Sequence, residues 1–119
     1  MEIYPYKCRP IFKERIWGGS KLRDVFAKPA PAETRIGESW ELADLPDDKT
    51  RIDNGPLKDR ILSEVITEYG PSVTGSIRIE GPFPLLVKIL DAEDVLSVQV
   101  HPDAQACRKM GKGKPKTEC

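Results

Sequence analysis

The segment LSVQVHP, residues 96–102, holds the side chains of this chain whose types and spacing best suit chemistry. It includes the single histidine of the 119 residues. Successive side chains of a β-strand point to opposite faces. A strand over residues 95–101 would therefore carry an apolar face of Leu96, Val98 and Val100. The other face would carry Val95, Ser97, Gln99 and His101. A row of neutral polar groups that ends in an imidazole is more typical of a cavity lining than of a solvent-facing strand.

Gln99 and His101 offer a carbonyl oxygen and a ring nitrogen, and Zn²⁺ accepts both kinds of donor. Glu118 adds a carboxylate far enough along the chain for a turn and a return on a neighbouring strand. These three residues predict a zinc site that lacks a fourth protein ligand, since no second histidine exists. Cys107 and Cys119 are weaker alternatives. A lone histidine on a strand is more often an ordinary surface or hydrogen-bonded residue, so both interpretations stay open.

Lys88 interrupts the apolar run PLLVKIL of residues 84–90. An unpaired lysine costs several kcal/mol if it is buried there. One interpretation is an edge lysine whose stem lies along the apolar surface while the ammonium reaches water. The other is a cation directed into a cavity that it shares with Ser97, where it would bind an anionic ligand. Lys116 belongs to the basic segment GKGKPK, which lacks the residue spacing of a phosphate-binding loop. The simplest interpretation is a basic loop exposed to solvent.

Composition narrows the class of protein. Lys plus Arg and Asp plus Glu both number 19, so no global field draws nucleic acid or an anionic membrane. Three cysteines without a CxxC motif favour free thiols in a reducing cytosol. The N-terminal residues lack the apolar region of a secretory signal, and no apolar run is long enough to cross a membrane. We therefore expect a cytoplasmic protein.

Periodicity predicts several elements. The clearest is a helix from about Pro56 to Tyr69, with apolar residues at three- and four-residue spacing, Asn54 as N-cap and Gly70 as its stop. Strands are expected at residues 36–44, with Trp40 in the core, at 84–90 and at 95–101. Short helices are expected near residues 21–26 and from residue 103 to Gly111. Glu38 and Glu41 should lie on opposite faces of their strand, which argues against a paired-carboxylate site.

Four segments in order along the chain resemble type I phosphomannose isomerases. These are IFKERIWGG, GESWELAD, FPLLVKILDAEDVLSVQVHPD and GKPKTEC. The resemblance spans nearly the whole chain. It implies a mainly β fold, a cupin-type jelly-roll barrel with one or two added helices. It also implies zinc-dependent interconversion of mannose 6-phosphate and fructose 6-phosphate. A barrel would turn alternate side chains into its interior, which would explain the polar row at residues 95–101.

The resemblance also implies roles for single residues. Gln99 and His101 match zinc ligands of a Q-x-H motif, and Glu118 matches the glutamate of a K-x-E motif. Lys88, Ser97 and Lys116 match positions that line the substrate site. The catalytic base is not assigned. The family uses a further histidine and an arginine later in the chain, and neither region occurs here. Residues 1–119 are thus expected to be the N-terminal part of the catalytic domain, truncated after the K-x-E motif and inactive alone.

Two other function classes remain open at this point. One is a non-catalytic cupin-like module that binds a sugar phosphate or a metal, and the other is a structural fragment without a function of its own. For the isomerase and for the binding module, the expected ligand is a small sugar phosphate, with no nucleic acid and no membrane partner. GDP-mannose synthesis and mannose catabolism are both compatible with the resemblance.

Overall fold

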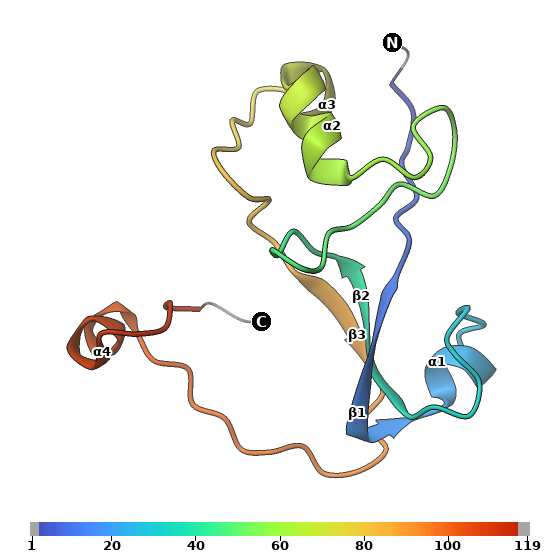
Figure 1. Cartoon of the computed structure of the whole chain (residues 1–119), viewed down its shortest axis with the longest axis vertical. Helices are drawn as coiled ribbons and strands as arrows, with labels where there is room; N and C mark the ends of the chain where they lie inside the picture. The colour runs from blue at the N-terminus through green and yellow to red at the C-terminus, as the bar shows by residue number, and fades with distance from the viewer. Residues whose placement is uncertain (1–2, 117–119) are drawn as a thin grey trace.

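The computed structural model describes residues 3–116 of the chain. Its framework is a three-stranded antiparallel sheet with the strand order β1-β2-β3 (Figure 1). The strands are β1 (Ile11–Gly19), β2 (Ile36–Leu42) and β3 (Val87–Leu90). The helices within that range are α1 (Lys21–Asp24), α2 (Leu62–Tyr69), α3 (Pro71–Thr74) and α4 (Ala104–Met110). The sheet at the centre confirms the mainly β class.

The middle strand β2 positions most of the buried residues of the sheet. Its first five residues are all buried, and β1 and β3 pair with its two edges. Trp40 lies opposite Ile11 on one side and opposite Lys88 on the other. The predicted strand at residues 36–44 and the core position of Trp40 are therefore confirmed.

A second core lies beneath α2. Ile52, Leu57 and Val65 form it, with partly buried Tyr4, Tyr6, Leu62, Tyr69 and Val73 packed around them. The N-terminal segment passes over this core and is attached to the loop before α2. The Lys7 amide donates to Asn54 Oδ1 at 2.7 Å, and Asn54 Nδ2 donates to the Pro5 carbonyl at 3.0 Å. The first residues of the chain thus complete a core that α2 alone would leave open.

The predicted helix at residues 56–69 is only half correct. The structure begins α2 at Leu62 with Ile61 as its N-cap, and residues 56–59 form turns. Asn54 is not the cap, because its side chain is occupied by the N-terminal segment. Leu57 still reaches the core, but from a turn. Gly70 ends α2 as expected, and the short helices near residues 21–26 and 103–111 are confirmed as α1 and α4.

The last two predicted strands differ from the structure. β3 covers only residues 87–90 of the predicted 84–90, and Pro84 lacks the N–H that a sheet ladder needs. Residues 95–103, which we call the arm, form neither strand nor helix. The strand prediction at 95–101 is therefore wrong for this structure. An extended segment persists as a strand only when a neighbour accepts its hydrogen bonds, and residues 95–100 make none to another segment within residues 3–116.

The arm leaves the body of the molecule and carries α4 at its far end (Figure 1). The radius of gyration is 16.9 Å. A compact domain of this length would have a radius of gyration of about 13.5 Å. α4 itself has well-formed ends: Asp103 accepts a hydrogen bond from the Ala106 amide, and Gly111 closes the helix with a left-handed φ of 64°. Among residues 3–116, no helix is long and apolar enough to cross a bilayer.

Candidate functional site

Lys88, the basic residue of the apolar run, meets a buried carboxylate. Its ammonium lies on the face of β3 that Trp40 and Glu38 occupy on β2, and Nζ is 3.1 Å from Glu38 Oε1. The Glu38 side chain is 8% exposed and the Lys88 side chain 27% exposed. The partial exposure of Lys88 agrees with an edge lysine that reaches water. Its fixed position beside Glu38 agrees with a cation held in place to bind an anion, so both interpretations stay open.

Glu38 receives two further hydrogen bonds that fix its carboxylate. Oε2 accepts from Trp40 Nε1 at 2.9 Å and from Arg15 Nη2 at 3.0 Å. Burial acts to raise the pKa of this carboxyl group, but the hydrogen bonds from Trp40 and Lys88 and the charges of Lys88 and Arg15 outweigh it and hold the pKa below its ordinary value. Glu38 is therefore an ionised acceptor at neutral pH.

The local sequence explains how Arg15 reaches this position. The pairing of β1 with β2 shifts in register between Lys13 and Glu14. Beyond the shift, the Arg15 side chain packs directly on Gly37, where an added Cβ would lie 2.6 Å from Arg15 Cβ. Gly37 thus leaves the space that allows the Arg15 guanidinium to bend toward Glu38.

The face of the sheet around Glu38 has one net positive charge. Arg15 and Lys88 are two cations around one carboxylate. Lys13 lies over the Trp40 ring, with Nζ 4.6 Å from its centroid, and is itself neutralised by Asp48 at 2.6 Å. Lysine has three N–H donors, and Glu38 accepts the one hydrogen bond that Lys88 makes within residues 3–116. The arrangement can hold a lysine at a fixed point while leaving donors for an anion.

Glu38 and Arg15 are residues that sequence reasoning missed as members of this cluster. The expected separation of Glu38 from Glu41 is confirmed, since Glu41 lies on the other face with Ser39 and Lys28. The available signal was the two-residue spacing of Glu38 and Trp40, which places both on one face, together with a nearby lysine that required an acceptor. No short-range pattern marks Arg15.

The polar row of the arm is present but does not meet the Glu38 cluster by any contact among the described residues. Gln99 Nε2 donates to Ser97 Oγ at 3.3 Å, so these two side chains lie on the same side of the arm as predicted. Ser97, Gln99 and His101 are all exposed. Lys116, beyond α4, is exposed as well.

The predicted zinc ligands are incompletely described. Glu118 lies outside the described residues. Within residues 3–116, no group of three or more His, Cys, Asp or Glu side chains is arranged to hold a metal ion. Cys107, an alternative ligand, is buried in α4, where its thiol donates to the Pro102 carbonyl at 3.9 Å. Gln99 and His101 provide suitable donor atoms two residues apart. The ligand assignment itself stays a prediction.

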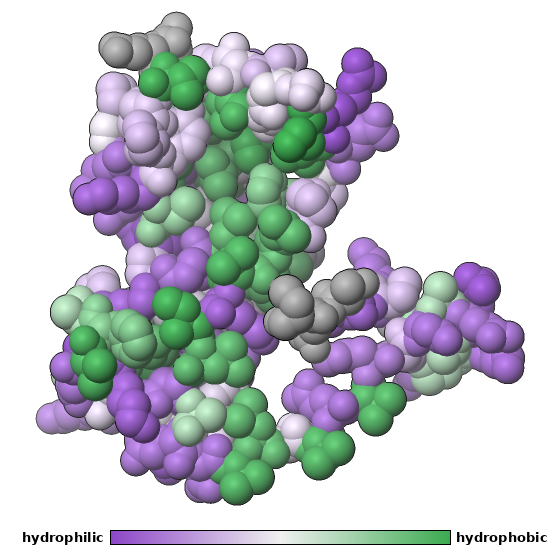
Figure 2. All heavy atoms as spheres, turned by 180° about the vertical axis from the view of Figure 1, so that it is seen from behind, coloured by the Kyte–Doolittle hydropathy of each residue, from purple (hydrophilic) through white to green (hydrophobic). Residues whose placement is uncertain are grey.

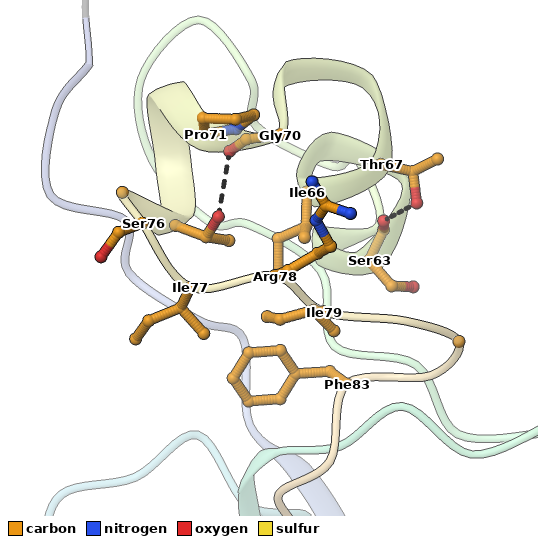
Figure 3. Close-up of a pocket in the computed structure, with 13 residues that line it drawn as sticks. Ser63, Ile66, Thr67, Gly70, Pro71, Ser76, Ile77, Arg78, Ile79 and Phe83 are labelled. Carbon is orange, nitrogen blue, oxygen red and sulfur yellow. Dashed lines mark hydrogen bonds between the residues drawn. The ribbon is translucent and has the colours of Figure 1, made fainter.

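A groove lies elsewhere, beside α2 and α3. It has a volume of about 800 Å³ and is lined by the two helices and residues 75–83 (Figure 3). Ile66, Ile77 and Phe83 supply apolar walls, and Arg78 is its charged residue. The groove contains none of the predicted site residues.

Comparison with known proteins identifies the family. Residues 6–117 match the family model for the phosphomannose isomerase type I catalytic domain. The chain is 42% identical over 118 residues to the "Probable mannose-6-phosphate isomerase GmuF" of Bacillus subtilis, covering 98% of this chain and 36% of that protein. It is 43% identical over 118 residues to the mannose-6-phosphate isomerase of Streptococcus mutans, covering 94% and 36%. The chain therefore spans about a third of the length of the curated relatives that it matches.

A solved structure gives the same result. The crystal structure of the mannose 6-phosphate isomerase from Bacillus subtilis superposes with a TM-score of 0.73 and 40% sequence identity, covering 88% of this chain and 32% of that one. The agreement in fold accompanies the agreement in sequence over 88% of this chain. The chain belongs to the type I phosphomannose isomerase family.

Proposed function

We propose that this chain contributes to a zinc-dependent isomerase that interconverts mannose 6-phosphate and fructose 6-phosphate. The observation that carries the proposal is family membership over residues 6–117, with relatives named mannose-6-phosphate isomerases. Because the chain covers 36% of two of these relatives, the activity is assigned to a longer polypeptide. Residues 1–119 would form the N-terminal part of its catalytic domain. The alternative, a non-catalytic cupin-like binding module, has no specific observation in its favour.

The proposed fold of the longer polypeptide is a cupin-type jelly-roll barrel. Two features support it. β3 is an edge strand of the described sheet, so its outer edge can receive another strand. The arm keeps the alternation of apolar and polar side chains that a barrel wall requires. In such a barrel the row of Ser97, Gln99 and His101 would face the interior.

For the substrate we propose that Lys88, Ser97 and Lys116 contact the sugar phosphate. Lys88 has the strongest physical support, because Glu38 fixes its ammonium and Arg15 keeps the cluster positive. A fixed cation costs less entropy on binding an anion than a mobile one. Ser97 would add a hydroxyl donor and acceptor for a sugar hydroxyl.

For the metal we propose Gln99, His101 and Glu118 as zinc ligands, one ion to a site, with a later histidine of the longer polypeptide as the fourth. The donor set suits zinc: an amide oxygen, an imidazole nitrogen and a carboxylate. When bound, the ion would polarise the carbonyl and hydroxyl oxygens of the substrate and stabilise negative charge on them.

The reaction is a proton transfer between C1 and C2 of the sugar through an enediol or enediolate. An α-proton becomes removable near neutral pH when the developing oxyanion is stabilised. The residues of this chain would hold the phosphate end and the hydroxyl groups, so that the reacting carbons stay in one orientation. The base is not assigned to any of the 119 residues.

The place of action that we propose is the cytoplasm, where Cys8 and Cys107 would stay reduced, as they are in the structure. We propose a small sugar phosphate as the ligand, with neither nucleic acid nor membrane as a partner, in line with the balanced charge. Synthesis of GDP-mannose is one pathway that the product would feed.

A zinc titration of the purified chain tests the ligand assignment. We expect weak binding that falls on the order of tenfold or more in His101→Ala and in Gln99→Ala, because each removes a donor atom. Cys107→Ala is the matched control and should bind zinc as the unmodified chain does. Equal binding by His101→Ala and the unmodified chain would remove His101 from the ligand set.

Binding of mannose 6-phosphate, followed by NMR shifts of the backbone amides, tests the substrate assignment. Lys88→Gln should weaken the response of the surrounding sheet residues. Lys28→Gln removes an equally paired lysine on the opposite face and should leave the response unchanged. Mannose without phosphate should give little response in any variant. An unchanged response in Lys88→Gln would show that Lys88 serves only the sheet.

The isolated chain should show no isomerase turnover. The later histidine and arginine that the resemblance implies would belong to the longer polypeptide, and residues 1–119 contain one histidine. A coupled assay of fructose 6-phosphate formation, run with and without added zinc, measures this directly. Turnover that persists through purification and disappears in His101→Ala would contradict the prediction that the isolated chain has an incomplete active site.

A further inference from the structure

The segment that leads into β3 has few backbone groups that can attach it to the sheet. Residues 82–84 are Pro-Phe-Pro, and a proline has no N–H to donate. Phe83 therefore carries the single backbone donor of these three residues. The pairing of β3 with β2 also shifts in register between Trp40 and Leu42, close to the start of β3. Because such a shift disrupts the hydrogen-bond ladder locally, backbone pairing gives this end of β3 little support.

Apolar contacts within the described residues add little at the same place. Leu85 is 57% exposed, Leu86 38% and Val87 46%. Figure 2 shows hydrophobic side chains gathered at the surface of the body. The run is also apolar at successive positions, so its pattern does not specify which face should meet the sheet. The entrance of β3, which we define as residues 83–87, therefore needs another attachment.

The Asp44 carboxylate provides that attachment. Asp44 lies two residues beyond Leu42, the last residue of β2. Its Oδ2 accepts a hydrogen bond from the Phe83 amide at 2.8 Å, and its Oδ1 accepts one from Ser63 Oγ on α2 at 2.9 Å. The Asp44 side chain is 7% exposed. Hydrogen bonds to a carboxylate are stronger than those between neutral groups. Asp44 thus takes the single donor of residues 82–84 and joins it to the end of β2 and to α2.

The two ends of β3 are attached differently. Beyond Leu90, the Asp91 amide donates to the Gly37 carbonyl at 2.8 Å, so the backbone pairing with β2 continues past the exit of the strand. The Asp91 side chain also accepts a hydrogen bond from the Lys21 amide at 2.7 Å. Within residues 3–116, the segment before β3 makes no comparable backbone bond. The entrance is therefore the end of β3 that depends on a single side chain.

Lys88 is the second residue of β3 and follows the entrance directly. We propose that Asp44 is a positioning residue for Lys88. By binding the Phe83 amide it keeps the entrance of β3 against β2, and this keeps the Lys88 ammonium beside Glu38. Without the anchor, the entrance would fray and the ammonium would become mobile. A mobile cation loses more entropy than a fixed one when it binds an anion. The binding of a sugar phosphate by Lys88 rests on the proposed function, but the anchoring of β3 does not.

Amide hydrogen exchange tests the anchor in the unmodified chain. The Phe83 amide should exchange at least about tenfold more slowly than in an unstructured peptide of the same sequence, because it donates to a carboxylate that is almost buried. Asp44→Ala should remove this protection. Asp44→Asn should keep it, because the amide oxygen still accepts from Phe83 and the NH2 group can donate to Ser63 Oγ. A Phe83 amide that exchanges at the unstructured rate in the unmodified chain would overturn the proposal, whether or not the variants fold.

The position of Lys88 can be followed by NMR in the same variants. Trp40 and Lys88 are partners across β2 and β3, so NOEs between their backbone protons should be strong in the unmodified chain and in Asp44→Asn. They should be weak in Asp44→Ala. If Asp44→Ala does not fold, Asp44→Leu replaces it, since leucine keeps the volume of the side chain without an acceptor.

Ser63→Ala is the matched control for the NOE measurement. It removes the other hydrogen bond of the same carboxylate and leaves the acceptor of the Phe83 amide in place. The NOEs between Trp40 and Lys88 should therefore stay strong in Ser63→Ala. Unchanged NOEs in the variant without an acceptor at residue 44, or equal losses in Ser63→Ala, would each contradict the role of Asp44.

Binding of mannose 6-phosphate separates positioning from a general loss of stability. Asp44→Ala should weaken binding by about two- to tenfold, because the Lys88 side chain must then be immobilised on binding. Asp44→Asn and Ser63→Ala should bind as the unmodified chain does. In the Lys88→Gln background, Asp44→Ala should weaken binding no further, because the residue that Asp44 positions is already gone.

The same titration distinguishes the two proposals. An additive loss in the double variant would show that Asp44 does not act through Lys88. If Lys88→Gln alone leaves binding unchanged, the substrate assignment fails, and the exchange and NOE measurements still decide whether Asp44 anchors β3.

Discussion

The Lys88 ammonium and the Glu38 carboxylate face each other across β3 and β2, with 3.1 Å between Nζ and Oε1. Two charges removed from water stabilise a fold only when further hydrogen bonds satisfy them. Trp40 and Arg15 supply those bonds to the second oxygen of Glu38. The pair thus connects β2 to β3, and through Arg15 to β1. Glu38 is therefore important for the stability of the sheet. It also fixes the position of the Lys88 ammonium, which is the cation proposed to bind the sugar phosphate.

Replacing Glu38 with alanine should lower the free energy of unfolding by about 2–3 kcal/mol, because Trp40 Nε1 and Lys88 would lose their acceptor in a largely buried place. Glu38→Gln should cost less, since an amide oxygen still accepts one hydrogen bond. Urea denaturation measures both. Glu41→Ala, on the opposite and more exposed face, should cost less than about 1 kcal/mol. Equal losses at the two positions would contradict the special role of Glu38.

The same carboxylate predicts a pH dependence of stability. The folded-state pKa of Glu38 lies below its ordinary value, which is about 4.3 in an unfolded chain. Its contribution should be fully present above that unfolded pKa and should be lost as the pH falls through the lower, folded pKa. The free energy of unfolding measured from pH 7 down to pH 3 should therefore fall less steeply in Glu38→Gln than in the unmodified chain. Parallel curves would show that Glu38 titrates alike in both states.

Leu57 should matter to stability although it lies in a turn. It is buried against Ile52 and Val65, and Leu57→Ala would leave a cavity costing about 2–5 kcal/mol. Ile77→Ala is the control, because Ile77 is exposed and should change stability by no more than about 0.5 kcal/mol. Thermal or urea unfolding measures the difference. A small loss for Leu57→Ala would mean that the core under α2 rearranges readily.

Gly37 should not tolerate a side chain. An added Cβ would lie 2.6 Å from Arg15 Cβ and 2.8 Å from the Trp17 ring, so Gly37→Ala would force β1 away from β2. Overpacking of this kind costs about 1–3 kcal/mol. We also expect the chemical shift of the Trp40 indole N–H to change, because displacement of Arg15 disturbs the shared acceptor Glu38. Stability and indole shift that both remain unchanged would contradict the close packing.

Sequence patterns predicted local elements well where the determinants are short-range. The strand around Trp40, the stop of α2 at Gly70 and the caps of α4 follow from residues within a few positions of each other. β1 carries Lys13, Glu14 and Arg15 in succession, which hides any strand alternation. Asn54 has the right type for a helix cap, but distant residues Lys7 and Pro5 bind its side chain instead.

By itself the sequence determined the alternation of Ser97, Gln99 and His101, the separation of Glu38 from Glu41 on opposite faces, and the motifs that place the chain in its family. These follow from the two-residue period of an extended chain, whichever neighbours it has. Only the tertiary structure decided that Lys88 meets Glu38, that Arg15 joins them over Gly37, and that the arm is not a strand among the described residues. Each of these depends on which segments lie side by side, because a hydrogen bond between strands, like a buried charge pair, needs a partner that local spacing does not specify.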